Sequence, residues 1–161
     1  MFTQLYLSPV GQLLLTADDT ALVALHFCDK GRSCFLSDDA AFTDHAILQA
    51  AKQWLDVYFS GQEPNFMPPL RPVGTDFQQE VWQLLHAIPY GKTTTYGEIA
   101  AALAARHGIP RMSAQAVGGA VGHNPIPIFI PCHRVVGSGG KLTGYSGGLE
   151  KKQFLLSNEH I

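Results

Sequence analysis

The 161-residue sequence has few cysteines and no long apolar run. Its three cysteines are Cys28, Cys34 and Cys132. Their number is small and odd, which does not favour a disulfide framework. We therefore expect a protein of a reducing compartment, the cytoplasm. No stretch of roughly 18 apolar residues is present, so we expect no transmembrane helix. The N-terminus has no basic segment ahead of an apolar one, so we expect no secretory signal.

Charge is also scarce, at 15% of the residues, and it is unevenly divided. Residues 1–70 carry three basic and eight acidic side chains, a balance of −5, whereas residues 71–161 carry eight and five, a balance of +3. A mildly basic C-terminal half is compatible with a phosphate-bearing partner. Many domains that bind no nucleic acid share such a balance, so charge alone does not identify a partner.

The first seventy residues alternate short apolar segments with turn residues. Residues 2–8, 11–17 and 21–27 are rich in strand formers and predict three short strands. Apolar residues at three- and four-residue spacing from 47 to 59 predict a helix. A proline-rich stretch over 61–72 predicts a linker. We therefore expect an N-terminal α/β domain over residues 1–71 and a second domain over 72–161.

The second half carries helix-start signals. Thr75 with Gln78 and Thr95 with Glu98 are capping-box patterns, and Ser113 could cap a helix over 114–122. Two short helices around a tight break predict a helix-turn-helix. A last helix, over 149–159, should turn Phe154, Leu155 and the stem of Lys151 inward. The expected fold class is α+β: a small N-terminal α/β domain with a short β-sheet, then a mostly helical domain.

Gly118 and Gly119 are unexpected inside a helix, because each costs about 1 kcal/mol relative to Ala. Close approach of another surface is a physical reason for glycine at such a place. That surface is either a neighbouring helix in the core or a DNA backbone, and the residues alone do not choose between them.

Cys132 and His133 follow a segment containing Pro125, Pro127 and Pro131, which excludes a regular helix or a central strand. We expect this segment to be extended and buried. A cysteine beside a histidine is weak evidence by itself, because buried cysteine is usually a small hydrophobe. A thiol with a proton acceptor nearby nevertheless becomes a strong nucleophile. Glu159 could orient that histidine, or could be an exposed terminal charge.

Several segments together carry a family resemblance. The sequence over 131–135 resembles the active-site signature of the O6-alkylguanine-DNA alkyltransferases, also called methylated-DNA–protein-cysteine methyltransferases. Asn124-Pro125 is similar to the hinge of this family, 145–149 to its substrate loop, and Leu155-Leu156 with Glu159 to its closing helix. Residues 77–82 and 88–91, together with Tyr96, are similar to the start of its C-terminal domain. The N-terminal segment Ser8-Pro9-Val10-Gly11, followed by Leu13-Leu14-Leu15, resembles the same region of bacterial members.

The resemblance implies single-turnover DNA repair, in which Cys132 takes an alkyl group irreversibly from O6 of guanine, and possibly from O4 of thymine. His133 would accept the thiol proton through a water, and Glu159 would orient His133. Tyr96 would donate a proton to N3 of the departing base. Neither a metal nor an organic cofactor is implied, and we expect a monomer. For Tyr96 and Asn124 the plainer alternatives are helix-start packing and a helix C-cap.

The resemblance further implies that the alkylated base is flipped out of double-stranded DNA. The residues expected to line the base pocket are Pro127, Val135, Tyr145, Ser146 and Gly147, with the carbonyls of Cys132 and Val135 reading the exocyclic amine. The helix over 114–122 would enter the minor groove. The residues expected to contact DNA are Thr95, Ala114, Gln115, Ala116, Gly118 and Gly119.

The sequence departs from the family pattern at Gln115, where an arginine usually fills the gap left by the flipped base. Glutamine can donate a hydrogen bond but lacks the charge and planar fork of arginine, so we expect weaker flipping unless Arg111 assists. His26, Cys28 and Cys34 lie close in sequence, but their spacing does not predict a zinc site. The competing hypotheses are a lesion-recognition protein without efficient transfer, in which tryptophan typically replaces the cysteine, and a transcription regulator.

Overall fold

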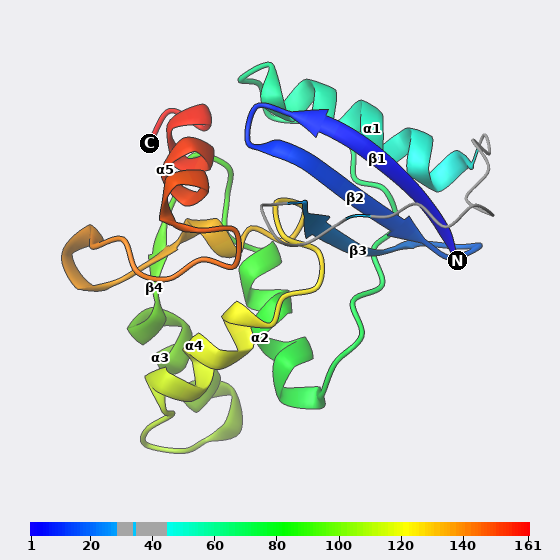
Figure 1. The fold of residues 1–161 in the computed structure, drawn as a ribbon. Helices are drawn as coiled ribbons and strands as arrows, with labels where there is room; N and C mark the ends of the chain where they lie inside the picture. Colours follow the sequence, from blue (N-terminus) through cyan, green and yellow to red (C-terminus); the bar gives the residue numbers. More distant parts are fainter. Residues whose placement is uncertain (29–33, 35–44) are drawn as a thin grey trace. The chain divides into compact units, whose positions relative to one another are not determined.

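The computed structural model describes residues 1–28, 34 and 45–161 (Figure 1). They form two compact units, Met1–Val73 and Gly74–Ile161, where the sequence places the boundary at residues 71 and 72. A short sheet followed by a mainly helical part confirms the predicted α+β class. Within these described ranges, no helix is long and apolar enough to cross a membrane.

The N-terminal unit is built on an antiparallel sheet with strand order β1-β2-β3. The strands are β1 (Phe2–Ser8), β2 (Gly11–Ala17) and β3 (Leu22–Phe27), close to the three predicted segments. The β1–β2 hairpin closes at Gly11, whose φ of 100° is strained for residues with a side chain. Ser8 fastens this turn by donating its hydroxyl to the Gly11 carbonyl at 2.6 Å.

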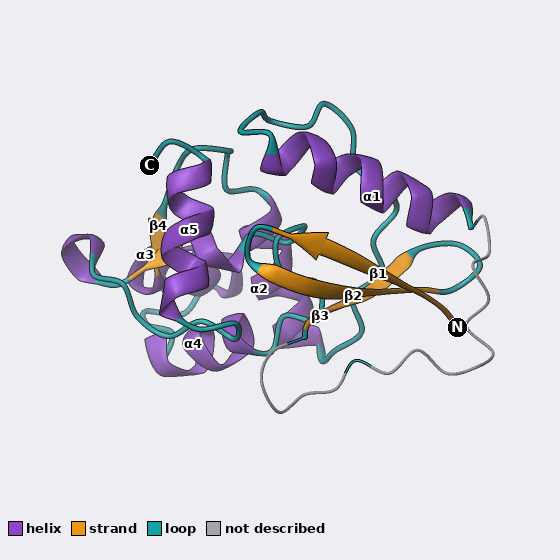
Figure 2. Ribbon diagram, turned by 45° about the horizontal axis from the view of Figure 1, so that its top comes forward, coloured by secondary structure: helices purple, strands orange, loops and turns teal. Residues whose placement is uncertain are grey.

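Helix α1 (Ala46–Phe59) covers one face of this sheet (Figure 2). Its buried residues recur at three- and four-residue spacing, from Leu48 to Tyr58, as an amphipathic helix requires. Alternate residues of β2, Leu13 and Leu15, are fully buried in the same core. Apolar burial therefore accounts for the packing of this unit.

Cys28 and Cys34 form a disulfide, which corrects the expectation that the cysteines stay unpaired. The number of cysteines does not predict this pair, because a disulfide forms only where the fold brings two Cα atoms to a suitable distance, here 5.5 Å. Cys132 is left as a free, buried thiol. In the disulfide neither sulfur is a thiolate that zinc could bind, and the residues described here contain no group of three metal-ligating side chains.

The C-terminal unit packs three helices together: α2 (Asp76–His86), α3 (Tyr96–His107) and α4 (Ala114–Gly122). Both predicted capping boxes are present at the starts of α2 and α3, and the Ser113 hydroxyl caps α4. The α3–α4 pair is the predicted helix-turn-helix. Trp82 of α2 donates its indole N–H to the Ala120 carbonyl at 2.9 Å and so ties α2 to α4.

Short elements follow the helices. Strand β4 (Thr94–Thr95) pairs in parallel with β5 (Val135–Val136), directly after a single turn of 3₁₀-helix, η1 (Cys132–Arg134). This pairing brings the start of α3 next to the cysteine segment. A second short turn, η2 (Ser138–Gly140), leads to a loop and then to α5 (Leu149–Asn158).

The buried face of α5 differs from the predicted one. Lys152, Leu155 and Leu156 are its buried residues, whereas Phe154 is 39% exposed. The prediction of Lys151 and Phe154 on the inward face was wrong and that of Leu155 was confirmed, because Leu155 lies at helical spacing from either lysine and the spacing alone does not fix which of them is buried.

Candidate active site

The segment before the nucleophile is a chain of turns, which corrects the extended conformation expected from its prolines. The buried Asn124 side chain organises it: Oδ1 accepts from the Ile126 N–H at 3.0 Å, and Nδ2 donates to the Ile130 carbonyl at 2.8 Å. Ile130 also donates its backbone N–H to the Ile126 carbonyl at 2.9 Å. Proline excludes regular elements but not turns, and Asn124 supplies the hydrogen bonds that the turns need.

Cys132 begins the 3₁₀ turn η1 and is only 5% exposed. Burial raises the pKa of its thiol to about 11, because a thiolate is poorly solvated there. The Asn124 side chain, the Lys152 ammonium and nearby backbone N–H groups act in the opposite direction. At neutral pH the thiol is therefore protonated, and its reaction as a nucleophile requires a base.

His133, the next residue, lies in a buried network centred on Glu159. Glu159 Oε2 is 2.5 Å from His133 Nε2, and Glu159 Oε1 accepts from Arg134 Nε at 2.7 Å and from the Gly91 N–H at 3.1 Å. Arg134 also donates to the Ile88 carbonyl at 2.8 Å. The side chains of His133 and Glu159 are fully buried. Glu159 is thus an anchored carboxylate, not an exposed terminal charge.

Burial lowers the pKa of His133, although the neighbouring Glu159 acts against this shift. A neutral imidazole has one donor and one acceptor nitrogen. With Nε2–H directed at the Glu159 carboxylate, Nδ1 is the nitrogen that can accept a proton. A cysteine, a neutral histidine and a buried carboxylate are the groups from which a cysteine nucleophile with a base and an orienting partner can be built.

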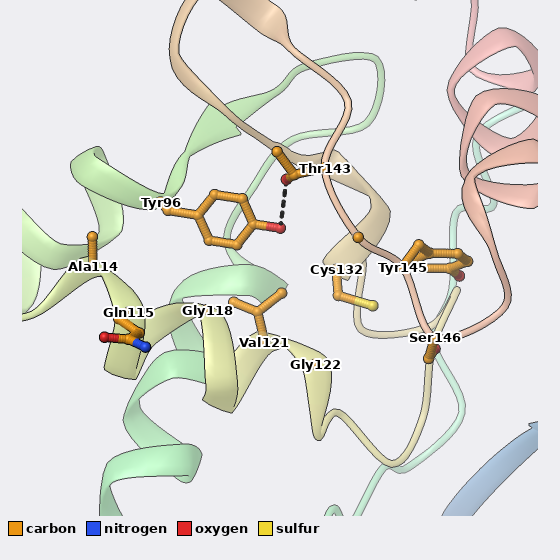
Figure 3. A pocket seen from close by; sticks show the side chains of 11 residues that line it. Tyr96, Ala114, Gln115, Gly118, Val121, Gly122, Cys132, Thr143, Tyr145 and Ser146 are labelled. Atoms are coloured by element: carbon orange, nitrogen blue, oxygen red, sulfur yellow. Dashed lines mark hydrogen bonds between the residues drawn. The ribbon is translucent and has the colours of Figure 1, made fainter.

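A pocket of about 630 Å³ opens at Cys132 (Figure 3). Helix α4, the start of α3 and the loop before α5 supply its walls. The lining residues are Tyr96, Ala114, Gln115, Gly118, Val121, Gly122, Cys132, Thr143, Gly144, Tyr145 and Ser146.

Thr143 links the pocket to a buried lysine behind it. The Thr143 hydroxyl donates to the Tyr96 phenol oxygen at 3.2 Å, as the dashed line in Figure 3 shows. The Thr143 carbonyl accepts from Lys152 Nζ at 3.1 Å. Lys152 is fully buried, and burial lowers its pKa.

The structure brings many of the predicted residues together at this pocket. Seven line it: Tyr96, Ala114, Gln115, Gly118, Cys132, Tyr145 and Ser146. Pro127 and Val135 are buried but are not among the lining residues, and neither is Gly147. Ala116 and Gly119 are exposed on α4. Thr95 uses its hydroxyl to cap α3, accepting from the Glu98 N–H at 3.1 Å.

Sequence reasoning missed the contributions of Arg134, Thr143 and Lys152. For Lys152 a signal existed, since positions 152, 155, 156 and 159 recur at the spacing of one helix face, and all four are buried. For Thr143 there was none, because its contacts with Tyr96 and Lys152 depend on the folded loop.

A helix-turn-helix beside a buried cysteine with a histidine–carboxylate pair defines a DNA-binding protein class with a cysteine nucleophile. The family profile described as "6-O-methylguanine DNA methyltransferase, DNA binding domain" matches residues 76–161. The profile of the ribonuclease-like domain of the same family matches residues 1–72. The chain belongs to the 6-O-methylguanine DNA methyltransferase family, which confirms the predicted resemblance.

Individual relatives agree with this assignment. The chain is 43% identical over 159 residues to the methylated-DNA–protein-cysteine methyltransferase of Methanosarcina acetivorans, covering 99% of this chain and 98% of that one. It is 44% identical over 156 residues to the protein of that name from Mycobacterium tuberculosis, covering 94% and 88%. A crystal structure of Mycobacterium tuberculosis OGT in complex with DNA superposes with a TM-score of 0.80 at 42% identity, over 99% and 92% of the chains.

Proposed function

We propose that this protein repairs DNA by transferring the alkyl group of O6-alkylguanine to the sulfur of Cys132. The observation that carries the proposal is the placement of Cys132 in a pocket, next in the chain to a histidine held by a buried carboxylate. Relatives named methylated-DNA–protein-cysteine methyltransferase and the solved DNA complex of one of them support this function.

The transfer is a substitution at the alkyl carbon. A carbon–sulfur bond forms as the bond between that carbon and O6 breaks, and the bonding electron pair leaves with the base. Because the thiol of Cys132 is protonated at neutral pH, His133 takes its proton, through a water, as the sulfur attacks. Glu159 keeps His133 in the tautomer that can accept this proton.

The departing base is a poor leaving group as an anion. Tyr96, whose phenol lies at the pocket, donates a proton to N3 of the base as the bond breaks. The phenol regains a proton at the expense of the one taken by His133, so that overall the thiol proton ends on the base. Tyr145 and Ser146 line the pocket where the base would lie.

A base reaches the buried sulfur only if it leaves the duplex. Helix α4 is suited to a groove, because its exposed face has the small residues Ala114, Ala116 and Gly119. Gln115 lies at the rim between this face and the pocket, where it would contact the orphaned partner base. The thioether product is not reversed by ordinary thiols, so each molecule acts once. The cytoplasmic location stays a prediction, and the Cys28–Cys34 disulfide removes the cysteine argument for it.

Intact-mass spectrometry tests the proposal. After incubation with an oligonucleotide carrying O6-methylguanine, the protein should gain one methyl group in place of a proton, and Cys132→Ala should gain nothing. The Cys28→Ser, Cys34→Ser double variant is the matched control, because it retains the reacting thiol and should still gain the methyl group. Tight binding to the lesion without any mass gain would instead identify a recognition protein that does not transfer.

A further inference from the structure

We propose that Thr143 is a positioning residue for the reaction, because its hydroxyl orients the phenol of Tyr96 toward the base. The inference rests on the proposed alkyl transfer and on Tyr96 as the proton donor.

The hydrogen bond between the two side chains has a direction that matters. The two hydroxyl oxygens lie 3.2 Å apart, and once the phenol turns its proton toward the base, its oxygen accepts from Thr143 Oγ1. The phenol proton is then free to point to another acceptor, and both residues line the pocket in which the base would lie. Hydrogen bonds in a chain polarise one another, so a phenol that accepts from Thr143 is also a better donor to the base.

Thr143 is itself held from two sides. Its carbonyl accepts from the buried Lys152 Nζ at 3.1 Å, which fixes the backbone. Its methyl group packs against Gly137, where an added Cβ would lie only 3.2 Å from Thr143 Cγ2. The Gly137 N–H in turn donates to the Lys141 carbonyl at 2.7 Å. Lys152 thus holds the Thr143 backbone and Gly137 contacts its methyl group, a support that lets the hydroxyl orient another side chain rather than merely fill space.

The test is a double-mutant cycle on the rate of transfer from O6-methylguanine in duplex DNA, measured in single turnover at saturating protein. Thr143→Val keeps the shape and loses the hydroxyl, so it should slow transfer by about fivefold, the value of one neutral hydrogen bond. Thr143→Ser should restore most of the rate. The dissociation constant for the lesion, measured in a Cys132→Ser background, should not change. Ser138→Ala removes an exposed hydroxyl nearby and should have no effect on the rate.

The cycle separates orientation of Tyr96 from a structural role. In a Tyr96→Phe background, Thr143→Val should change the rate by less than about twofold, because the group it orients is gone. An equal slowing in both backgrounds would mean that Thr143 acts through the loop, and would overturn the inference while leaving the proposed transfer intact. A Tyr96→Phe protein as fast as the wild type would remove the proton-donor role and the inference with it. A wild-type protein that forms no thioether would refute the proposed function itself.

Discussion

The two compact units differ in what they bury. Among the residues that the structure describes, the N-terminal unit buries one polar side chain, Ser8, within an apolar core. The C-terminal unit buries five: Asn124, His133, Arg134, Lys152 and Glu159. Burying charge is unfavourable unless partners compensate. Since an apolar core is often as stable, stability alone does not account for five such groups in the C-terminal unit, and the proposed transfer at Cys132 would give them a use.

The ion pairs of the two units show the same contrast. In the N-terminal unit Arg71 pairs with Asp18, and the arginine side chain is 56% exposed. In the C-terminal unit Arg134 pairs with Glu159, and the two side chains are 9% and 0% exposed. An exposed pair contributes little, whereas breaking a buried one leaves an uncompensated charge. The comparison therefore predicts unequal responses to the same kind of substitution.

The largest effect is expected for Glu159→Gln. It removes the charge that offsets Arg134 and orients His133, so it should lower the free energy of unfolding by about 3 kcal/mol. It should also slow alkyl transfer by roughly a hundredfold or more, because the base loses its orienting partner. Urea denaturation and single-turnover rates measure the two effects.

Arg71→Gln is the matched control, since it breaks the exposed pair. It should change the free energy of unfolding by less than about 1 kcal/mol and leave the transfer rate unchanged. Similar losses of stability in the two variants would show that burial does not decide what these ion pairs contribute.

Stability should depend on pH through the Cys132 thiol, whose pKa rises from 9.0 to about 11 on burial. Between these values the unfolded chain releases a proton that the folded protein keeps. The stability contribution is therefore full below about pH 9 and is lost as the pH rises toward 11, to a total of about 3 kcal/mol. The free energy of unfolding of the wild type should therefore fall relative to that of Cys132→Ser across this pH range.

Thiolate absorbance near the ultraviolet cut-off gives an independent check on the same group. The difference between wild type and Cys132→Ser removes the contribution of the tyrosines and should titrate near pH 11. A midpoint below pH 8 would mean that the thiol is ionised in the resting protein, and the need for His133 as a base would fall away.

Much of the fold was predictable because local signals and tertiary structure agree. The strands, the capping boxes at Thr75 and Thr95 and the start of α4 at Ser113 all follow from short-range hydrogen bonding and periodicity. The turns after Asn124 were not predictable, because a side-chain amide replaces the regular backbone pairing there. The Cys28–Cys34 disulfide was also missed, because the count of cysteines does not show which two sulfurs the folded chain brings together.

The site divides in the same way. Cys132, His133 and Glu159 were identified from motifs, and the structure places His133 and Glu159 in contact. Arg134 and Lys152 were not recognised as buried, because sequence statistics place such residues at the surface. Residues whose role depends on a partner distant in sequence, such as Thr143 with Tyr96, become visible only in the folded chain.

A smaller effect is expected on the exposed face of the C-terminal unit, for Gln115→Arg. Gln115 is exposed at the rim of the pocket, away from the buried network. An arginine adds a charge and a planar fork that can fill the gap left by a flipped base, so the rate on duplex DNA should rise severalfold. The rate on free O6-benzylguanine, which needs no flipping, should not change. Equal effects on the two substrates would contradict a role of this position in flipping.

A small gain in stability is expected for Gly119→Ala, and this variant decides between the two explanations for glycine at 119 in α4. A Cβ at Gly118 would lie 3.9 Å from the Tyr96 ring, an ordinary packing contact, whereas one at Gly119 would meet nothing within 4 Å. Packing in this chain therefore does not require glycine at 119. Alanine there should raise the free energy of unfolding by about 0.5–1 kcal/mol, from helix propensity alone.

The same variant should slow reaction with duplex DNA if α4 enters a groove, because the added methyl group keeps the helix from the backbone. Reaction with free O6-benzylguanine provides the internal control and should proceed at the wild-type rate, since no groove is involved. A more stable protein with an unchanged rate on duplex DNA would show that Gly119 does not face the nucleic acid. The exposed small residues of α4 would then need another explanation, while the buried site at Cys132 would be unaffected.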